Sequence, residues 1–357
     1  MAYSETTGRT KVNVDQLIAY AFREAGKTAE EMTPEYVEAG KQALFYNLQN
    51  LSNLGVNLWL LDNQLYGTVA FQQKLDLPAT TIDVREANWV YVQNLQISEA
   101  LPFDNPDAPA LFDQNLNTHG TSTVGENWFG AYFEPAEPVF YVGINAYVTG
   151  PIGSTTTYTL AYETSPDGIT WTTQQVFDPV TLADREWKYW YIYTTPNNSF
   201  YRLRETVNTT FSLRQIVFSQ STQVIPLARL NRDDYWNLPN KQFASQRSLQ
   251  YWYDRQIEPS MYLWPTPNND FQMFQLIVEK QMMDVGSLTN EIYVPDRWIT
   301  SVQASLSHKL AIQIPGVSDT RIAYLEAQAD KLFMQANNEE RDKSPIYFAP
   351  NISVYTR

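Results

Sequence analysis

The chain contains no cysteine, which excludes structural disulfides, thiol nucleophiles and thiolate metal ligands. It has only two histidines, His119 and His308, so no metal site with two histidines at helical spacing exists. Nowhere do about 18 apolar residues follow one another, as a membrane-spanning helix requires. The first residues, MAYSETTGRTKVNVDQ, contain no apolar signal region. We therefore expect a soluble protein that has no membrane partner and is made in a reducing cytosol.

Charged residues are scarce, and the acidic ones prevail. The 357 residues include 39 Asp and Glu against 25 Lys and Arg, which gives a net charge of −14 at pH 7. Because nucleic acids are polyanions, general affinity for DNA or RNA is disfavoured. Aromatic residues, by contrast, make up 14% of the chain. This composition is typical of extensive sheet and of surfaces that neighbouring molecules cover.

A helical hairpin is predicted at the start of the chain. Asn13 is a suitable N-cap and Gly26 a suitable stop for the first helix, whose apolar residues recur at spacings of three and four. These residues are Val14, Leu17, Ile18, Ala21, Phe22 and Ala25. The second helix is expected to begin at Thr33 and Pro34 and to end at Gly55. Its apolar face is formed by Val37, Gly40, Leu44, Leu48 and Leu51.

Helical spacing returns near the C-terminus. A third helix is predicted from Pro295 to Pro315, and a fourth begins at a cap near Ser318. The apolar face of the third consists of Ile299, Val302, Leu306 and Leu310. That of the fourth consists of Ile322, Leu325, Ala329, Leu332 and Ala336.

The segment 342–357 has two prolines and no helical period. It nevertheless contains an apolar series that cannot bury itself by its own folding, so we expect it to dock on a partner. The expected docking residues are Ile346, Tyr347, Phe348, Ile352, Val354 and Tyr355.

The middle of the chain, residues 98–222, is β in character. Short runs such as FYVGINAYV, WKYWYIYTT and FYRLRET alternate with turns rich in Pro, Gly, Asn and Ser, as in a sandwich or barrel. Alternation places Trp187, Tyr189 and Tyr191 on one face of a strand, so we expect part of this aromatic run in a core or subunit contact. The stretch TSPDGITW predicts a hairpin whose turn contains Asp167 and Gly168.

These elements predict an α+β fold with nested domains. Residues 1–97 and 223–341 form one domain, which combines the helical hairpin, the two C-terminal helices and a small antiparallel β part. An all-β, jelly-roll-like sandwich, residues 98–222, is inserted into it, and residues 342–357 follow as an extended tail. A domain whose termini lie close together can be inserted into a surface loop without disturbing its host.

No motif of catalysis or cofactor binding is found. EAGKT at 24–28 lacks the earlier glycine of a phosphate-binding loop and follows a helix, so it is interpreted as a helix end. The acidic pairs Asp233–Asp234 and Glu339–Glu340 are adjacent in sequence, which favours solvated faces or local salt bridges over acid-base chemistry. We expect neither an enzyme nor a cofactor or a bound metal.

The outer segments resemble the head-to-tail adaptor, or head completion protein, of short-tailed and related bacteriophages. The resemblance covers roughly residues 10–95 and 224–340 and depends on GVNLW, PLARLNRDDYWNLPNK, QYWYDRQ, MYLWPTPNND and IYVPDRWITSVQASLSHKLA. The resemblance implies that about twelve copies form a ring beneath the portal protein, and the tail residues Ile346 to Tyr355 would then dock on the portal or on a neighbouring subunit. A head-to-tail contact repeated by rotation can close such a ring. The implied place is the head-tail junction of the virion, after assembly in the host cytoplasm.

The middle segment resembles the discoidin, or coagulation-factor type C, galactose-binding-like sandwich. ALFDQNLNT, ENWFGAYF, VFYVGINAYV and YTLAYETSPDGITW carry this resemblance, together with YRLRETV and LRQIVFS. Relatives often bind sugars through loops at one end, and some hold calcium at the segment that matches Asp113, Asn115 and Thr118. Gln114 stands where a glycine is usual there.

Together the two resemblances imply a structural virion protein with a decorated ring. Its partners would be the portal, the tail nozzle or tail tube, the tail fibre proteins and further copies of itself. DNA would pass through the ring without sequence-specific binding, and the sandwich would contact a glycan or the capsid. Two other classes stay open: a carbohydrate-binding protein that recognises a host or capsid-surface glycan, and an enzyme such as a glycan hydrolase.

Overall fold

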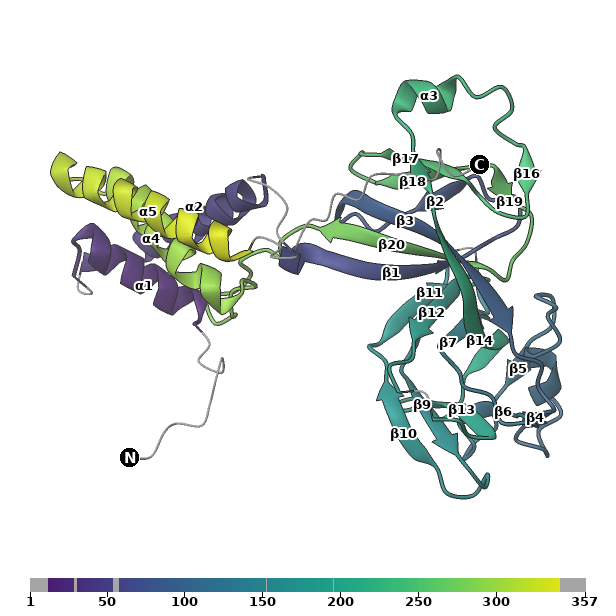
Figure 1. Ribbon diagram of the computed structural model, residues 1–357. Coiled ribbons are helices and arrows are strands. Elements are labelled where there is room, and N and C mark those ends of the chain that lie inside the picture. Colours follow the sequence, from purple (N-terminus) through teal and green to yellow (C-terminus); the bar gives the residue numbers. More distant parts are fainter. Residues whose placement is uncertain (1–11, 29–30, 54–57, 152, 195, 341–357) are drawn as a thin grey trace, which may run out of the picture. The chain divides into compact units, whose positions relative to one another are not determined.

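The computed structural model describes residues 12–28, 31–53, 58–151, 153–194 and 196–340 (Figure 1). Contacts divide the chain into two compact units, Met1–Leu61 with Lys280–Arg357 and Asp62–Glu279. The first unit is helical and the second consists mainly of antiparallel strands, so the predicted α+β class is confirmed. Among the described residues, no helix is both long and apolar enough to cross a lipid bilayer.

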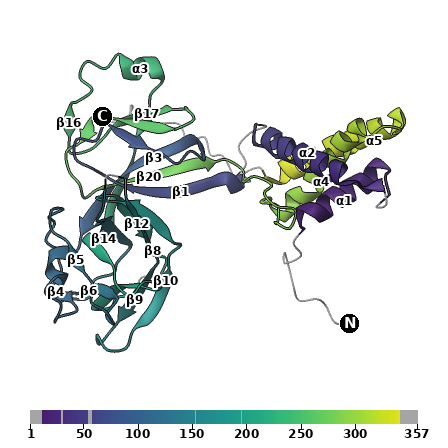
Figure 2. The same ribbon diagram turned by 180° about the vertical axis from the view of Figure 1, so that it is seen from behind.

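The helical unit combines helices from the two ends of the chain (Figures 1 and 2). Helix α4 contacts each of the other three helices. The predicted helices are all present, although the predicted end of the second, Gly55, lies outside the described residues. Their bounds are Val14–Ala25 for α1, Pro34–Asn53 for α2, Asp296–Gln313 for α4 and Asp319–Glu340 for α5, with a short 3-10 helix, η2, at Leu58–Leu60.

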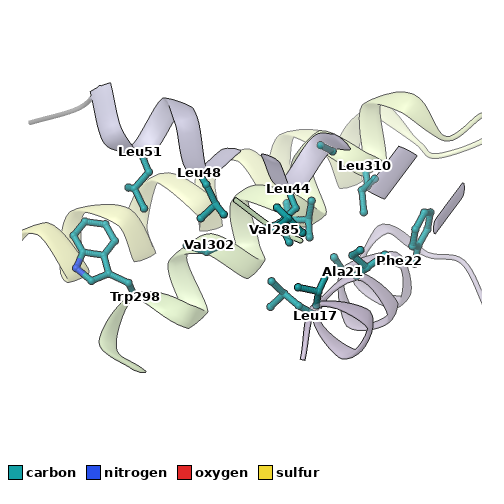
Figure 3. Packing of buried hydrophobic residues seen from close by; sticks show 14 of the residues in the cluster. Leu17, Ala21, Phe22, Leu44, Leu48, Leu51, Val285, Trp298, Val302 and Leu310 are labelled. Carbon is teal, nitrogen blue, oxygen red and sulfur yellow. The ribbon is translucent and has the colours of Figure 1, made fainter. Parts of the chain in front are cut away.

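The apolar faces predicted from the helical period form the core of this unit. Figure 3 shows Leu17 and Phe22 of α1 near Leu44 of α2 and Leu310 of α4. Helices α1 and α2 approach closely at Gly40, where an added Cβ would lie 2.7 Å from Cγ2 of Ile18. A side chain at this point of the second helix would therefore force Ile18 to shift.

The ends of α1 explain why it begins and stops where the sequence predicts. Asn13 has extended φ and ψ angles, and its N–H donates to Oε1 of Gln16 over 3.4 Å. At the other end Gly26 has a φ of 100°, and its N–H donates to the carbonyl of Arg23. The stretch EAGKT is therefore a helix C-terminus, as expected.

The β unit contains two large sheets. The seven-stranded sheet has the order β1-β20-β3-β14-β7-β12, with β5 paired to β14, and the five-stranded sheet has the order β10-β9-β13-β6-β4. In the first, the bounds are Leu61–Gly67 (β1), Met273–Lys280 (β20), Thr81–Asn94 (β3), Ser212–Pro226 (β14), Tyr141–Ala146 (β7), Trp187–Tyr191 (β12) and Gly120–Thr121 (β5). In the second they are Thr172–Val176 (β10), Leu160–Ser165 (β9), Phe200–Glu205 (β13), Trp128–Tyr132 (β6) and Glu99–Leu101 (β4).

Smaller elements complete the unit. A four-stranded sheet has the order β15-β17-β18-β2. Two further pairs of strands, β11-β8 and β16-β19, form separate two-stranded sheets. Their bounds are Ala228–Arg229 (β15), Gln250–Asp254 (β17), Ser260–Trp264 (β18), Lys74–Asp76 (β2), Val180–Ala183 (β11), Thr155–Tyr158 (β8), Ala244–Ser245 (β16) and Thr266–Pro267 (β19). A short helix α3 covers Arg232–Trp236 and a 3-10 helix η3 covers Ala108–Leu111.

The two large sheets form a sandwich. Their shared core contains Phe129 of β6, Tyr162 of β9 and Leu203 of β13 from one sheet, with Ile144 of β7 and Ile216 of β14 from the other. Burial alternates along β13, where every second residue is buried, whereas all residues of β7 and β9 are buried. The sandwich is assigned from this core, which the two sheets share.

The seven-stranded sheet coils strongly, so that its first and last strands meet. Gly67 at the end of β1 lies so close to β12 that an added Cβ would be 2.5 Å from Cβ of Trp187. Tyr189 of β12 also contacts Gly143 of the neighbouring strand β7. Trp187 and Tyr189 are buried, as expected for part of this aromatic run, whereas Tyr191 is 43% exposed.

The long strand β14 has two different partners along its length. Strand β14 pairs with β7 over its first part and with β3 over its second part, from Ser219 to Pro226. The predicted end of the insert at residue 222 falls within this strand. The boundaries at 98 and 222 are sequence-based expectations, whereas contacts divide the chain at Leu61/Asp62 and Glu279/Lys280.

Candidate functional site

The predicted docking residues of the C-terminal tail lie outside the described residues. Docking through Ile346, Tyr347, Phe348, Ile352, Val354 and Tyr355 therefore stays a prediction. The candidate sites described below belong to the β unit.

The hairpin TSPDGITW connects β9 to β10 as the sequence predicts. Gly168 has a φ of 74°, which favours glycine, and Oδ1 of Asp167 accepts from the N–H groups of Ile169 at 2.9 Å and Thr170 at 2.8 Å. These bonds from Thr170 and Ile169, followed by one from the Ser165 hydroxyl, lower the pKa of Asp167 to about 2. The carboxylate is thus ionised at neutral pH and holds the turn.

Beside this hairpin lies a hollow of about 440 Å³ on the outer face of the five-stranded sheet. Outward-facing Trp128 of β6 and Phe200 of β13 line it, together with Trp171. The rings of Trp128 and Trp171 are 5.7 Å apart between centroids. Trp171 packs back on the sheet as expected. The remaining lining residues are Leu101, Pro102, Phe103, Asp104, Asp167, Gly168 and Ile169.

An ion network lies on the same face behind the aromatic rings. Glu163 of β9, which is 3% exposed, accepts from Nε of Arg202 at 2.7 Å and from Nε of Arg204 at 2.9 Å. Burial opposes ionisation of Glu163, but Arg204 and Arg202 outweigh it, so its pKa is lowered. The guanidinium of Arg202 also lies over the Trp171 ring, 4.1 Å from its centroid.

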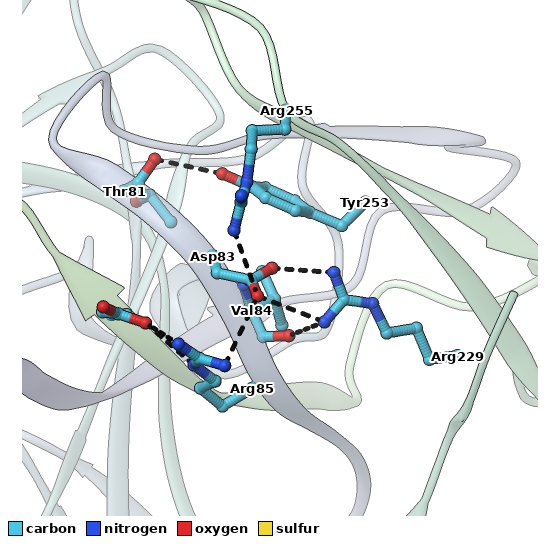
Figure 4. Close-up of polar contacts among 8 residues, drawn as sticks. Thr81, Asp83, Val84, Arg85, Arg229, Tyr253 and Arg255 are labelled. Atoms are coloured by element: carbon cyan, nitrogen blue, oxygen red, sulfur yellow. Dashed lines mark hydrogen bonds and ion pairs between the residues drawn. The ribbon is translucent and has the colours of Figure 1, made fainter. Parts of the chain in front are cut away.

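A second polar cluster surrounds Asp83 of β3 (Figure 4). Asp83 is 5% exposed, and its carboxylate lies 2.8 Å from Nη2 of Arg229 and 3.3 Å from Nη2 of Arg255. Arg85 is 3.9 Å from the same carboxylate and forms an ion pair with Glu279 of β20. Each guanidinium already contacts a carboxylate, so this cluster links β3 to β15 and β20 and serves the fold.

The segment at which some relatives hold calcium forms a loop with internal hydrogen bonds. Oδ1 of Asp113 accepts from the N–H of Asn115 at 2.8 Å, and Oδ2 accepts from the hydroxyl of Thr118 at 2.8 Å. Gln114 has a φ of 57°, the conformation that favours the glycine usual in the family. Within the described ranges, no three His, Cys, Asp or Glu side chains gather where a metal ion could bind.

His119, Asp234 and Glu340 each contact other residues of the protein. His119 stacks on Tyr147 with the ring centroids 3.8 Å apart. Asp234 lies in the first turn of α3 and donates its N–H to Asn231. Glu340 is buried and accepts from Nε of Arg297 at 2.6 Å, so its salt bridge joins α5 to α4 and is not the local one expected from the sequence.

Sequence reasoning identified Asp167, Gly168 and Trp171 but not the hollow that they help to line. Arg202, Glu163 and Phe103 were not singled out. A signal was present: in FYRLRE the arginines alternate with buried Tyr201 and Leu203, which places both charges on the outer face of a sandwich strand.

No protein-family model and no curated protein matches the chain. Among solved structures, a CBM32 domain of AlyQ in complex with 4,5-unsaturated mannuronic acid matches with 15% identity and a TM-score of 0.29, over 35% of this chain and 97% of that one. The F5/8 type C domain of a Bacteroides fragilis protein matches with 15% identity and a TM-score of 0.28, over 42% of this chain and 99% of that one.

A pectin binding carbohydrate binding module matches with 16% identity and a TM-score of 0.28, over 37% of this chain and 93% of that one. These neighbours are two carbohydrate-binding modules and an F5/8 type C domain. The sandwich is assigned from the core that the two large sheets share.

Proposed function

We propose that this chain is a structural assembly protein, the head-to-tail adaptor of a tailed bacteriophage. It forms a ring beneath the portal, continues the DNA channel and provides the attachment site for the tail. The resemblance of residues 10–95 and 224–340 motivates this proposal. The exposed apolar surface of the helical unit is the observation that supports it.

This surface follows helix α5. Tyr324 and Met334 are 66% and 64% exposed, although both are large apolar side chains. Two hollows of about 620 and 390 Å³ lie along the same helix and share Tyr324 and Gln328 in their linings. Exposed apolar area of this kind marks surfaces that a neighbouring molecule covers. In a ring, each copy offers one such surface to the next copy.

The test mixes the purified chain with the portal ring of the same phage and measures the mass of the complex by native mass spectrometry. We expect a stoichiometric ring on the portal, visible also by electron cryomicroscopy. Tyr324→Arg should prevent ring closure, whereas Ile257→Arg, at a 92% exposed position of the β unit, should not. A chain that stays monomeric beside the portal contradicts the proposal.

The predicted docking tail has its own test. Deletion of residues 342–357 removes the apolar series from Ile346 to Tyr355 and should abolish attachment to the portal while the thermal unfolding of the chain is unchanged. A truncated chain that still completes infectious virions contradicts docking through the tail.

A second candidate function is recognition of a glycan by the sandwich, either as a decoration of the ring or as the main role. The hollow between Trp128, Trp171 and Phe200 favours it, because half-buried aromatic rings that line a concave site are suited to the flat faces of sugar rings. Screening the purified chain on a glycan array tests this function independently of the portal.

A further inference from the structure

Several apolar side chains that line the hollow on the five-stranded sheet stay partly or largely exposed to solvent. Trp128, Trp171 and Phe200 are half-buried, and they come from β6, the end of the hairpin and β13. Phe103 and Ile169 line the hollow as well and are 64% and 84% exposed. A ligand that enters the hollow therefore removes apolar area from water on several sides.

The rings are held in place without a ligand. Arg202 lies 5.0 Å from the centroid of Trp128 and 4.1 Å from that of Trp171, and Glu163 holds its guanidinium. Gly130, the register partner of Arg202, makes this arrangement possible because an added Cβ would lie 2.8 Å from Cβ of Arg202. Phe200 packs similarly under Gly168. Little side-chain freedom remains to be lost on binding, which favours affinity.

The charge of the hollow is negative. Two carboxylates line it, those of Asp104 and Asp167. Asp104 is exposed, and within the described part of the chain its carboxylate has no hydrogen bond or ion pair. Behind the rings, Glu163 offsets one of the two charges of Arg202 and Arg204. The carboxylates at the hollow outweigh the single positive charge that is left, so an anionic ligand is repelled.

We propose that this hollow binds a sugar residue that carries no carboxylate group. The aromatic faces contact the apolar C–H face of the sugar ring, and Asp104 accepts hydrogen bonds from its hydroxyl groups. Uronic acids are excluded by the carboxylates. The inference rests on the second candidate function above, and it adds a location and a rule of selection to it.

The experiment screens the full chain on an array that pairs neutral oligosaccharides of galactose, glucose and mannose with the corresponding uronate oligomers. Titration calorimetry then measures the affinity for the best neutral oligomer. Phe103→Ala and Ile169→Ala should each weaken it, by about tenfold for the aromatic ring. Both side chains are largely exposed, so folding is expected to persist, and circular dichroism checks it. Ile257→Ala, at a 92% exposed position outside the hollow, is the matched control and should leave the affinity unchanged.

The charge rule has a separate variant. Asp104→Asn keeps the size of the side chain and removes its charge, so it should raise binding of uronate oligomers relative to neutral ones. A wild-type preference for uronates overturns the rule of selection. Neutral binding that survives both Phe103→Ala and Ile169→Ala overturns the location and leaves glycan recognition in place. Absence of binding across the array overturns this inference and the second candidate function, and it does not touch the adaptor proposal.

Discussion

Tyr189 is packed tightly against two glycines of the β unit, and a single added methyl group tests this packing. The ring lies between Gly143 of β7 and Gly67 of β1. A Cβ added at Gly143 would be 2.4 Å from Cε1 of the ring, and one added at Gly67 would be 2.9 Å from Cε2. Tyr189 is 2% exposed and stacks on Trp187, with centroids 5.3 Å apart, so the ring cannot withdraw without moving Trp187.

We expect Gly143→Ala to lower the free energy of unfolding of the β unit by about 2 kcal/mol. Overpacking a filled core costs up to about 3 kcal/mol, and the stiffer unfolded chain returns about 1 kcal/mol. In a unit of this size the Tm should fall by about 4 to 8 °C. Differential scanning calorimetry measures it, and the transition of the helical unit serves as an internal reference.

A second background identifies the cause of the loss. When Tyr189→Val has already removed the ring, the added methyl of Gly143→Ala meets open space and should cost little. The two substitutions together should therefore be much less destabilising than the sum of their separate effects. An unchanged Tm for Gly143→Ala, or the same loss in the Tyr189→Val background, would refute the reasoning.

Three further predictions concern other parts of the chain. Glu163→Gln should lower the Tm relative to the wild type. This difference in Tm should be full at pH values above the ordinary glutamate pKa of 4.5 and should vanish as the pH falls through the lowered pKa of Glu163. A difference in Tm that does not depend on pH contradicts this. Asp83→Ala should destabilise the β unit by about 1 to 3 kcal/mol in urea titrations, because its partly exposed arginines lose a buried partner. The control Asp76→Ala, with a 77% exposed side chain, should change little. Gly40→Ala should destabilise the helical unit by about 1 kcal/mol through its contact with Ile18, despite the better helix propensity of alanine; a more stable helical unit refutes it.

The helices could be predicted because their determinants are local. Asn13 and Gly26 bound α1 as expected, and its six predicted apolar residues are all buried. The hairpin at Asp167 and Gly168 was equally predictable, since a turn of this kind depends on neighbouring residues only. Period, capping and turn chemistry were sufficient for these elements.

The hollow could not be predicted because its parts meet only through tertiary packing. Trp128 and Trp171 are brought together by β6, β13, β9 and β10, and no periodicity links positions so far apart in sequence. The position of Arg202 over these rings depends further on Gly130 opposite it in the register. The same reason applies to the limits of the sandwich, because β14 pairs with two different strands along its length.

The nested order of the chain has a consequence for its synthesis. Helices α1 and α2 leave the ribosome before α4, which contacts both and is made only after all of Asp62–Glu279. At about 5 to 20 residues per second, this interval lasts on the order of 10 to 40 seconds. The apolar face of the nascent hairpin stays uncovered during that time. Pairing of β1 with β20 then brings the flanking segments together, so the middle of the chain closes a long loop for its two ends.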